Sequence, residues 1–218
     1  MMHQRTTTLP PFGECYGWES GVRVQNSRSS GPFAATSIAV FLFFLVHVLA
    51  AQETAPFPNP PDAVQNKVAL ADHNEPGLRI IIKGIVYKSD GKTPYAGLVL
   101  YLYQTDATGV YNKKNRSWRE PRLQGWLKTD SAGGYAIRTI KPGAYPGGKI
   151  PAHIHLTMKY PDGHTRWLDD FLFEGDPNLS KKEIAAFSGK GNFSSIVQLN
   201  PQPRGPFYGR RDIVIPEQ

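Results

Sequence analysis

Cysteine is almost absent from this sequence. Cys15 is the single cysteine among 218 residues, so the chain can form no internal disulfide and no zinc cluster of thiolate ligands. The scarcity of cysteine does not by itself assign the protein to a cellular compartment.

A dense run of basic residues is also missing. The formal net charge is +7, but the 25 lysines and arginines are scattered along the chain. A positive surplus can attract anionic partners, including aromatic acids or nucleic acid. Nucleic-acid-binding tails and modules, however, show clustered cations or a recognisable motif, and the sequence has neither. We therefore expect no nucleic-acid partner.

Long helical patterns are scarce as well. The chain contains 21 glycines and 19 prolines, which favour turns and short strands over long helices. Apolar residues make up 40% and charged residues 20%, which excludes a disordered or wholly membrane-embedded chain. A chain of this length is sufficient for one domain with a substantial core.

One long apolar run lies near the N-terminus, at residues 37–52 (SIAVFLFFLVHVLAAQ). No charged residue occurs between Arg28 and Glu53, two arginines precede the run, and two alanines lie at its end. Basic residues, then an apolar run, then small residues are the order typical of a signal peptide. The apolar core of about fourteen residues is short for a membrane span. We expect residues 1–51 to be an N-terminal extension plus a signal peptide or uncleaved signal anchor. The protein is then exported, periplasmic or secreted, and touches a membrane only through this segment if it stays uncleaved.

The rest of the chain alternates short strand-like segments with turn sequences. Residues 52–77 are rich in proline and asparagine and are expected to form an arm. Residues 78–218 are expected to be an all-β domain, an antiparallel β-sandwich of the immunoglobulin or prealbumin kind with long loops and little helix. Strands are expected at 78–88, 96–105, 123–129, 135–140, 149–160, 165–173, 193–199 and 210–216, with a short helix at 181–187.

The strand KIPAHIHLTMKY, residues 149–160, carries two histidines on one side. Successive side chains of a strand point to opposite faces, so His153 and His155 share a face while Ile154 and Leu156 point to a core. The two imidazoles either belong to a polar solvent face or form half of a metal site.

Two tyrosines lie in loops that could complete such a site. Tyr145, in GAYPGG, precedes the histidine strand, and Tyr111, in ATGVYNKK, follows an earlier strand. Either ring could instead serve loop packing, as many tyrosines do. Tyr135, in GGYAIRT, is expected to pack within the sandwich.

Four segments between Gly84 and Pro177 resemble the intradiol ring-cleavage dioxygenases, the catechol and protocatechuate dioxygenase family. They are GIVYKSDGKTPYAGLVLYLYQTDATGVY, TDSAGGYAIRTIKPGAYP, PAHIHLTM and FEGDP. The chain is similar to the smaller exported members, which lack a long N-terminal helical domain. The resemblance implies an Fe(III) site at the active-site loops, with Tyr111, Tyr145, His153 and His155 as ligands.

The resemblance also implies a reaction. A small aromatic diol and O2 would be converted to a muconate-type product by cleavage between the hydroxyl-bearing carbons, without an organic cofactor. Tyr145 would leave the iron as substrate binds and act as the catalytic base. Phenolate oxygens are hard, anionic donors that favour Fe(III), and a tyrosine binds as the anion because the metal competes for its proton.

The sequence departs from the family pattern around the substrate. Family members carry an arginine three residues before the first histidine, where this chain has Ile150. Substrate-binding roles are expected for three residues, Gln124, Trp126 and Arg138, with Arg122 and Arg166 as further sources of positive charge. Two other interpretations stay open: a non-catalytic sandwich that serves as a binding module, and a sandwich that holds copper or zinc. The oligomeric state is not indicated.

Overall fold

A computed structural model describes residues 58–113, 119–189 and 191–217. Residues 1–51, on which the expectation of a signal peptide or anchor rests, lie outside this part of the chain. Within the described residues, no helix has the length and apolar character needed to cross a membrane.

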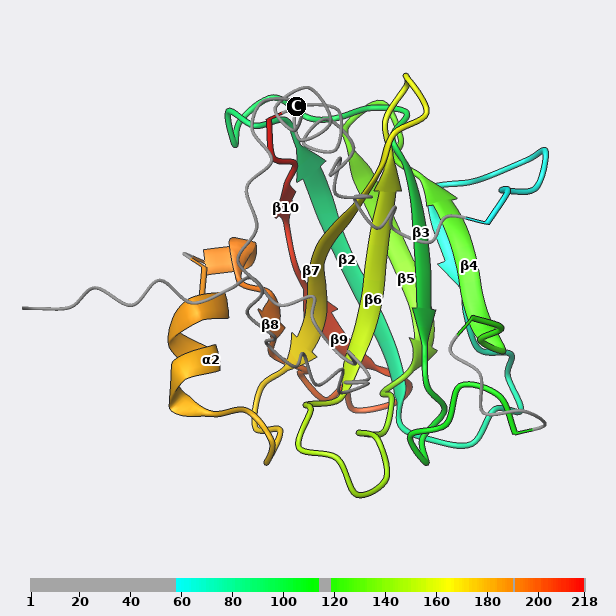
Figure 1. The fold of residues 1–218 in the computed structure, drawn as a ribbon, viewed down its shortest axis with the longest axis vertical. Coiled ribbons are helices and arrows are strands. Elements are labelled where there is room, and N and C mark those ends of the chain that lie inside the picture. Colours follow the sequence, from blue (N-terminus) through cyan, green and yellow to red (C-terminus); the bar gives the residue numbers. More distant parts are fainter. Residues whose placement is uncertain (1–57, 114–118, 190, 218) are drawn as a thin grey trace, which may run out of the picture. The chain divides into compact units, whose positions relative to one another are not determined.

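The domain consists of two sheets that face each other (Figure 1). The first sheet has the order β1 (Lys67–Ala69), β5 (Gly134–Ile140), β2 (Arg79–Tyr87) and β10 (Ile213–Val214), and β9 (Phe207–Arg210) also pairs with β2. The second has the order β4 (Leu123–Lys128), β3 (Val99–Gln104), β6 (His153–Lys159), β7 (Thr165–Phe173) and β8 (Ile196–Val197). The short helix α2 (Lys181–Phe187) and a 3-10 turn (Gly191–Phe193) connect β7 to β8.

The expected all-β sandwich with little helix is confirmed. The central pairs β2–β5, β3–β4, β3–β6 and β6–β7 are antiparallel. Each sheet also has parallel pairs toward its margins, β1–β5, β2–β9 and β2–β10 in the first and β7–β8 in the second. Strand direction is set by the long connections that bring distant segments together, which a local residue pattern does not specify.

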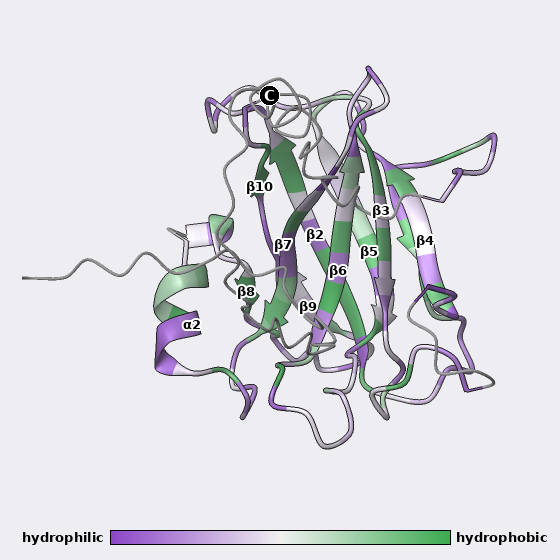
Figure 2. Cartoon of the chain, in the orientation of Figure 1, coloured by the Kyte–Doolittle hydropathy of each residue, from purple (hydrophilic) through white to green (hydrophobic). Residues whose placement is uncertain are grey.

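The core between the sheets consists of alternate residues of the long strands. On β6, Ile154, Leu156 and Met158 are fully buried, and they pack with Leu100 and Leu102 of β3. Hydrophobic residues gather on the strands and hydrophilic ones in the connecting loops (Figure 2). Each buried aliphatic side chain contributes about 1.5–3 kcal/mol of transfer free energy, so this face fixes the direction of the opposite one.

The outer face of the second sheet is more closed than the sequence indicates. Tyr101 and Tyr103 alternate with the core leucines of β3 and therefore project from the outer face, yet they are only 2% and 3% exposed. Their rings pack with Tyr111, Trp126 and Tyr145 in a separate aromatic cluster. The site described below lies in this cluster, outside the main core.

The folded domain also begins earlier than the expected boundary at residue 78. Strand β1 lies within the segment expected to be an arm and pairs with β5. Just before it, the Gln65 carbonyl accepts a hydrogen bond from the Lys128 amide of β4, and the Asn66 carbonyl accepts one from the Ala136 amide of β5. One short segment therefore joins the edges of both sheets.

Candidate metal centre

Two loops at one end of the sandwich carry the two tyrosines. Residues 105–122 connect β3 to β4 and contain Tyr111, and residues 141–152 connect β5 to β6 and contain Tyr145. In each loop a glycine stands two positions before the tyrosine, Gly109 in one and Gly143 in the other.

These glycines let the two backbones approach closely. Gly109 has φ of +81°, and a Cβ there would lie 2.0 Å from the carbonyl oxygen of Ala144. A Cβ on Gly143 would lie 2.6 Å from the carbonyl oxygen of Ala107. Only glycine fits at such contacts, so the pair of Gly-x-Tyr sequences positions both phenols.

Asp106 holds the two loops together. Its carbonyl accepts the Gly143 amide at 2.9 Å, and its carboxylate accepts the amides of Thr108 and Val110 at 2.8 and 3.2 Å. Burial opposes the ionised form, but the hydrogen bonds from Thr108 and Val110 outweigh it and hold the pKa of Asp106 below its ordinary value. The loop that carries Tyr111 is thus stabilised by a buried anion.

Four potential ligand atoms converge at the ends of these loops and β6. The Tyr111 hydroxyl lies 2.8 Å from Nε2 of His155, and the Tyr145 hydroxyl lies 3.2 Å from Nε2 of His153. The two Nε2 atoms are 3.0 Å apart, and the two hydroxyls contact each other. The structure therefore brings together the four residues that the sequence predicts as ligands.

Both histidines are oriented by contacts to their other ring nitrogen. Nδ1 of His153 donates to the Pro151 carbonyl at 2.7 Å, and Nδ1 of His155 lies 3.2 Å from a carboxylate oxygen of Asp170. These partners place the proton on Nδ1 and leave the Nε2 lone pairs directed at the cluster centre. Burial, together with the neighbouring His155, lowers the pKa of His153, which favours the neutral ring that a metal requires.

The donor set fits a cation, and ferric iron in particular. Two imidazole lone pairs that face each other repel unless a positive charge lies between them, and each phenol can supply only one proton. Burial, and then the neighbouring Tyr145, raises the pKa of Tyr111, so its phenolate needs a cation as partner. Two hard phenolate oxygens with two imidazoles suit Fe(III), which Tyr111, Tyr145, His153 and His155 would hold.

Asp170 contacts the candidate centre and was not named from the sequence. Its carboxylate groups with His153 and His155 within 4.8 Å, but its contact is to Nδ1 of His155, so it orients a ligand rather than serving as one. The β6–β7 register shifts between Ile154 and Leu156, and this bulge directs Asp170 toward His155. The only local signal was an acidic pair within the otherwise apolar segment WLDDFLF.

Gln124 and Trp126 lie on the same face of the sheet as the cluster. Gln124 accepts a hydrogen bond from the Tyr101 hydroxyl at 2.5 Å, and the Trp126 ring lies 5.1 Å from the Tyr101 ring. The indole N–H of Trp126 donates to the carbonyl of Pro58 at 3.0 Å. Both residues therefore support the aromatic cluster beside the donors.

The three arginines considered as substrate-charge partners are directed elsewhere. Arg138 is exposed on β5, in the opposite sheet, so the structure does not bring it to the site. Arg122 forms a two-pronged ion pair with Glu75, at 2.5 and 2.7 Å, and Arg166 is exposed and donates to the Glu217 carbonyl. The position of Arg138 follows from the strand that carries it, and those of Arg122 and Arg166 from their tertiary partners, neither of which the sequence specifies.

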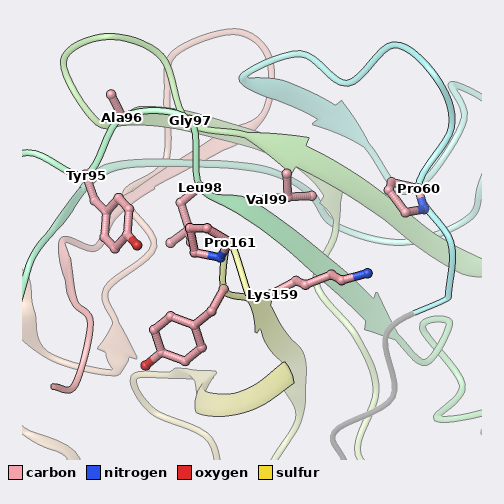
Figure 3. Close-up of a pocket in the computed structure, with 9 residues that line it drawn as sticks. Pro60, Tyr95, Ala96, Gly97, Leu98, Val99, Lys159 and Pro161 are labelled. Atoms are coloured by element: carbon pink, nitrogen blue, oxygen red, sulfur yellow. The ribbon is translucent and has the colours of Figure 1, made fainter. Parts of the chain in front are cut away.

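A separate hollow of about 260 Å³ lies at the far end of β3 and β6 (Figure 3). Its lining includes Tyr95, Leu98, Val99 and Lys159. Val99 and Lys159 are register partners at the end of the strands opposite to that of the donors. This hollow is therefore not part of the candidate centre.

The profile of a protein family described as Dioxygenase matches residues 54–199. The chain belongs to the intradiol ring-cleavage dioxygenase family. Among curated relatives of this family member, the protocatechuate 3,4-dioxygenase beta chain of Burkholderia cepacia is 32% identical over 135 residues, 57% of each chain. Catechol 1,2-dioxygenase 2 of Acinetobacter lwoffii is 28% identical over 126 residues, 50% of this chain and 45% of that one. The chain thus spans about half the length of the curated relatives it matches.

Solved structures support the fold of this dioxygenase family member. The dioxygenase domain of a carbohydrate-binding fusion protein from Streptomyces sp. SirexAA-E has a TM-score of 0.55 at 23% identity, over 73% of this chain and 93% of that one. An intradiol ring-cleavage dioxygenase from Tetranychus urticae has a TM-score of 0.53 at 18% identity, over 75% and 91%. At these identities the likeness concerns the fold alone.

Proposed function

We propose that this protein is a ferric intradiol dioxygenase, which cleaves a catechol-type aromatic diol with O2 to a muconate-type diacid. The observation that carries the proposal is the convergence of two phenolic oxygens and two Nε2 atoms, with Tyr111 and Tyr145 each in contact with one histidine. The modest identity to the protocatechuate and catechol dioxygenases named above supports the same reaction class.

The different surroundings of the two tyrosines support different roles. Tyr111 is 8% exposed, within the aromatic cluster, whereas Tyr145 is half-buried and the next four residues, 146–149, are exposed. A ligand on such a loop is free to move, while a buried one is held. We therefore assign Tyr111 as the residue that would hold the iron throughout and Tyr145 as the residue that would move to act as base toward the diol.

The chain's own residues then handle the protons. Ferric iron held by these residues would supply Lewis acidity toward the diol. The phenolate oxygen of Tyr145 accepts a proton from one diol hydroxyl, so the substrate becomes electron-rich enough to react with O2. His153 and His155 keep their orientation through Pro151 and Asp170. Both oxygen atoms of O2 enter the product, and no organic cofactor is required.

The test is reconstitution with ferric iron, followed by absorption spectroscopy and oxygen uptake with catechol, protocatechuate and hydroxyquinol. We expect a burgundy protein, because tyrosinate-to-ferric charge transfer absorbs visible light, and oxygen uptake with at least one diol. Tyr145→Phe removes the base and should reduce turnover by about 10²–10⁴-fold.

The matched control is Tyr160→Phe, since the Tyr160 hydroxyl donates to the Pro216 carbonyl, away from the cluster. It should leave colour and turnover intact. A colourless, iron-free wild-type protein would contradict the proposal, and elemental analysis of protein from native cells would separate iron from copper or zinc.

We also propose that the protein is exported. The support is the basic, apolar and small order of residues before Gln52. Mass spectrometry of the mature N-terminus tests it, with cleavage close to Ala51 expected for a signal peptide, and an intact N-terminus in a membrane fraction expected for a signal anchor.

A further inference from the structure

Two rows of side chains cross the outer face of the second sheet beside the candidate centre. In the donor row, Gln124, Tyr103 and His155 are register partners on β4, β3 and β6. Register partners on neighbouring strands project to the same face of a sheet. The donor row therefore runs directly into the metal ligands.

The aromatic row lies one step further along the same strands. Its members are register partners on β4, β3, β6 and β7, namely Trp126, Tyr101, Thr157 and Trp167. Two residues of a strand span about 7 Å, so this row runs parallel to the donor row at about that distance. Tyr101 stacks on Tyr103, so the two rows are in contact, and the fully buried Thr157 lies between Tyr101 and Trp167.

Trp167 is the open end of the aromatic row. It is 40% exposed, whereas Tyr101 is buried and Trp126 is half-buried with its N–H bound to the Pro58 carbonyl. The Trp167 ring lies 5.7 Å from the ring of His155, edge-on, and 6.4 Å from the ring of Tyr103. An exposed indole thus stands in direct contact with the ring of a predicted metal ligand.

We propose that Trp167 determines substrate specificity by stacking against an aryl group attached to the diol ring, so that the substrate is an aryl-substituted catechol. This inference rests on the proposed function, because a diol bound at the donors is what brings its substituent to the aromatic row. A second ring bonded directly to the diol ring lengthens the substrate by one ring, which matches the spacing between the donor row and the aromatic row. Indole offers a large apolar face, and offset or edge-to-face stacking adds to the area it buries.

The experiment uses the ferric protein with catechol and 4-phenylcatechol. Anaerobic calorimetry gives the dissociation constant of each diol, and oxygen uptake gives kcat/KM. Trp167→Ala should weaken binding of 4-phenylcatechol relative to catechol by about three- to tenfold, the value of one aromatic stack. Trp167→Phe, which keeps a ring, should retain most of the preference.

A remote exposed ring provides the matched control. Tyr208 is 36% exposed on β9 of the other sheet, and Tyr208→Ala should leave both dissociation constants unchanged. If Trp167→Ala changes the dissociation constants of the two diols by the same factor, or changes neither, the inference is overturned. A wild-type protein that binds neither diol would also overturn it. Binding of both diols without oxygen uptake would contradict only the proposed function.

Discussion

The carboxylate of Asp170 contacts Nδ1 of His155, on the side of the ring opposite the proposed iron ligand atom Nε2. Asp170→Ala removes the acceptor for Nδ1, so the ring can rotate or change tautomer, and iron affinity should fall about 10–100-fold. Asp170→Asn keeps an oxygen and should cost less. Competition with a chelator of known affinity measures the change.

A second histidine–aspartate contact supplies the control. Nδ1 of His164 lies 3.4 Å from Asp162, and both side chains are exposed on a turn away from the donors. Asp162→Ala should leave iron affinity unaltered. Iron held as tightly by Asp170→Ala as by the wild type would show that the β6–β7 bulge has no part in the centre.

Single residues show how far sequence reasoning extends. Tyr111, Tyr145, His153 and His155 could be named because each lies in a short motif, and strand alternation placed both histidines on one face. Asp170 could not be assigned to His155, because its direction depends on a bulge between two strands. The arginines could not be placed for a related reason, since tertiary partners decide where a long side chain points.

At the scale of elements, the contact between the two tyrosine loops sets the geometry. Gly109→Ala introduces both an unfavourable positive φ and a clash with the Ala144 carbonyl. The loops must separate, so we expect a loss of about 3 kcal/mol in the free energy of unfolding and a loss of the visible band. Urea unfolding and absorption spectra measure the two effects.

Gly147→Ala separates conformational strain from the clash. Gly147 lies in the same loop as Tyr145 with φ of +73°, but a Cβ there would have no atom within 4 Å. The substitution should cost only about 1 kcal/mol and leave the colour intact. If the two alanine variants behave alike, close approach of the loops is not what positions the phenols.

The stability of these loops depends on pH through the carboxylate of Asp106. Its pKa is depressed in the folded protein, so its contribution is fully present above the pKa of the unfolded chain and is lost as pH falls through the folded value. Asp106→Asn keeps the Oδ1 acceptor but removes the charge. The stability gap between wild type and variant should therefore be largest near neutral pH and should close on acidification below about pH 4.

Thermal unfolding from pH 7 to pH 3 measures this gap. Asp62→Asn, at an exposed position of the chain before β1, serves as the control and should show no such closing gap. A gap for Asp106→Asn that stays constant with pH would mean that the carboxylate is not ionised in the folded loop.

Most strands could be predicted at this scale, because their periodicity and turn residues are local signals. Segments 165–173 and 181–187 appear as expected, as strand β7 and helix α2. Ser180 is the N-cap of this helix, and it forms a capping box with Glu183. The parallel partners and β1 could not be predicted, because a strand of three residues has no periodicity of its own.

For the molecule as a whole, the segment around β1 contributes to the core, since Val68 packs against it and Leu70 belongs to it. Leu70 is 5% exposed, and its Cδ2 would lie 3.1 Å from a Cβ on Gly125 of β4. Leu70→Ala should lower the free energy of unfolding by about 2–4 kcal/mol. Leu78→Ala, at a position 42% exposed, should change it by less than about 0.5 kcal/mol. Denaturant unfolding measures both variants. Equal free energies of unfolding would show that the segment around β1 is an arm outside the core.

Gln65 and Asn66 also cover backbone amides of both sheets. A free sheet edge presents unpaired amides and carbonyls that can recruit a strand from another chain, the first step of many aggregates. Here the carbonyls of Gln65 and Asn66 accept hydrogen bonds from amides of β4 and β5. The edge strand on that side, β1, is only three residues long. That side of the sandwich therefore offers another copy little backbone to pair with, which protects a β-rich protein against aggregation at high concentration.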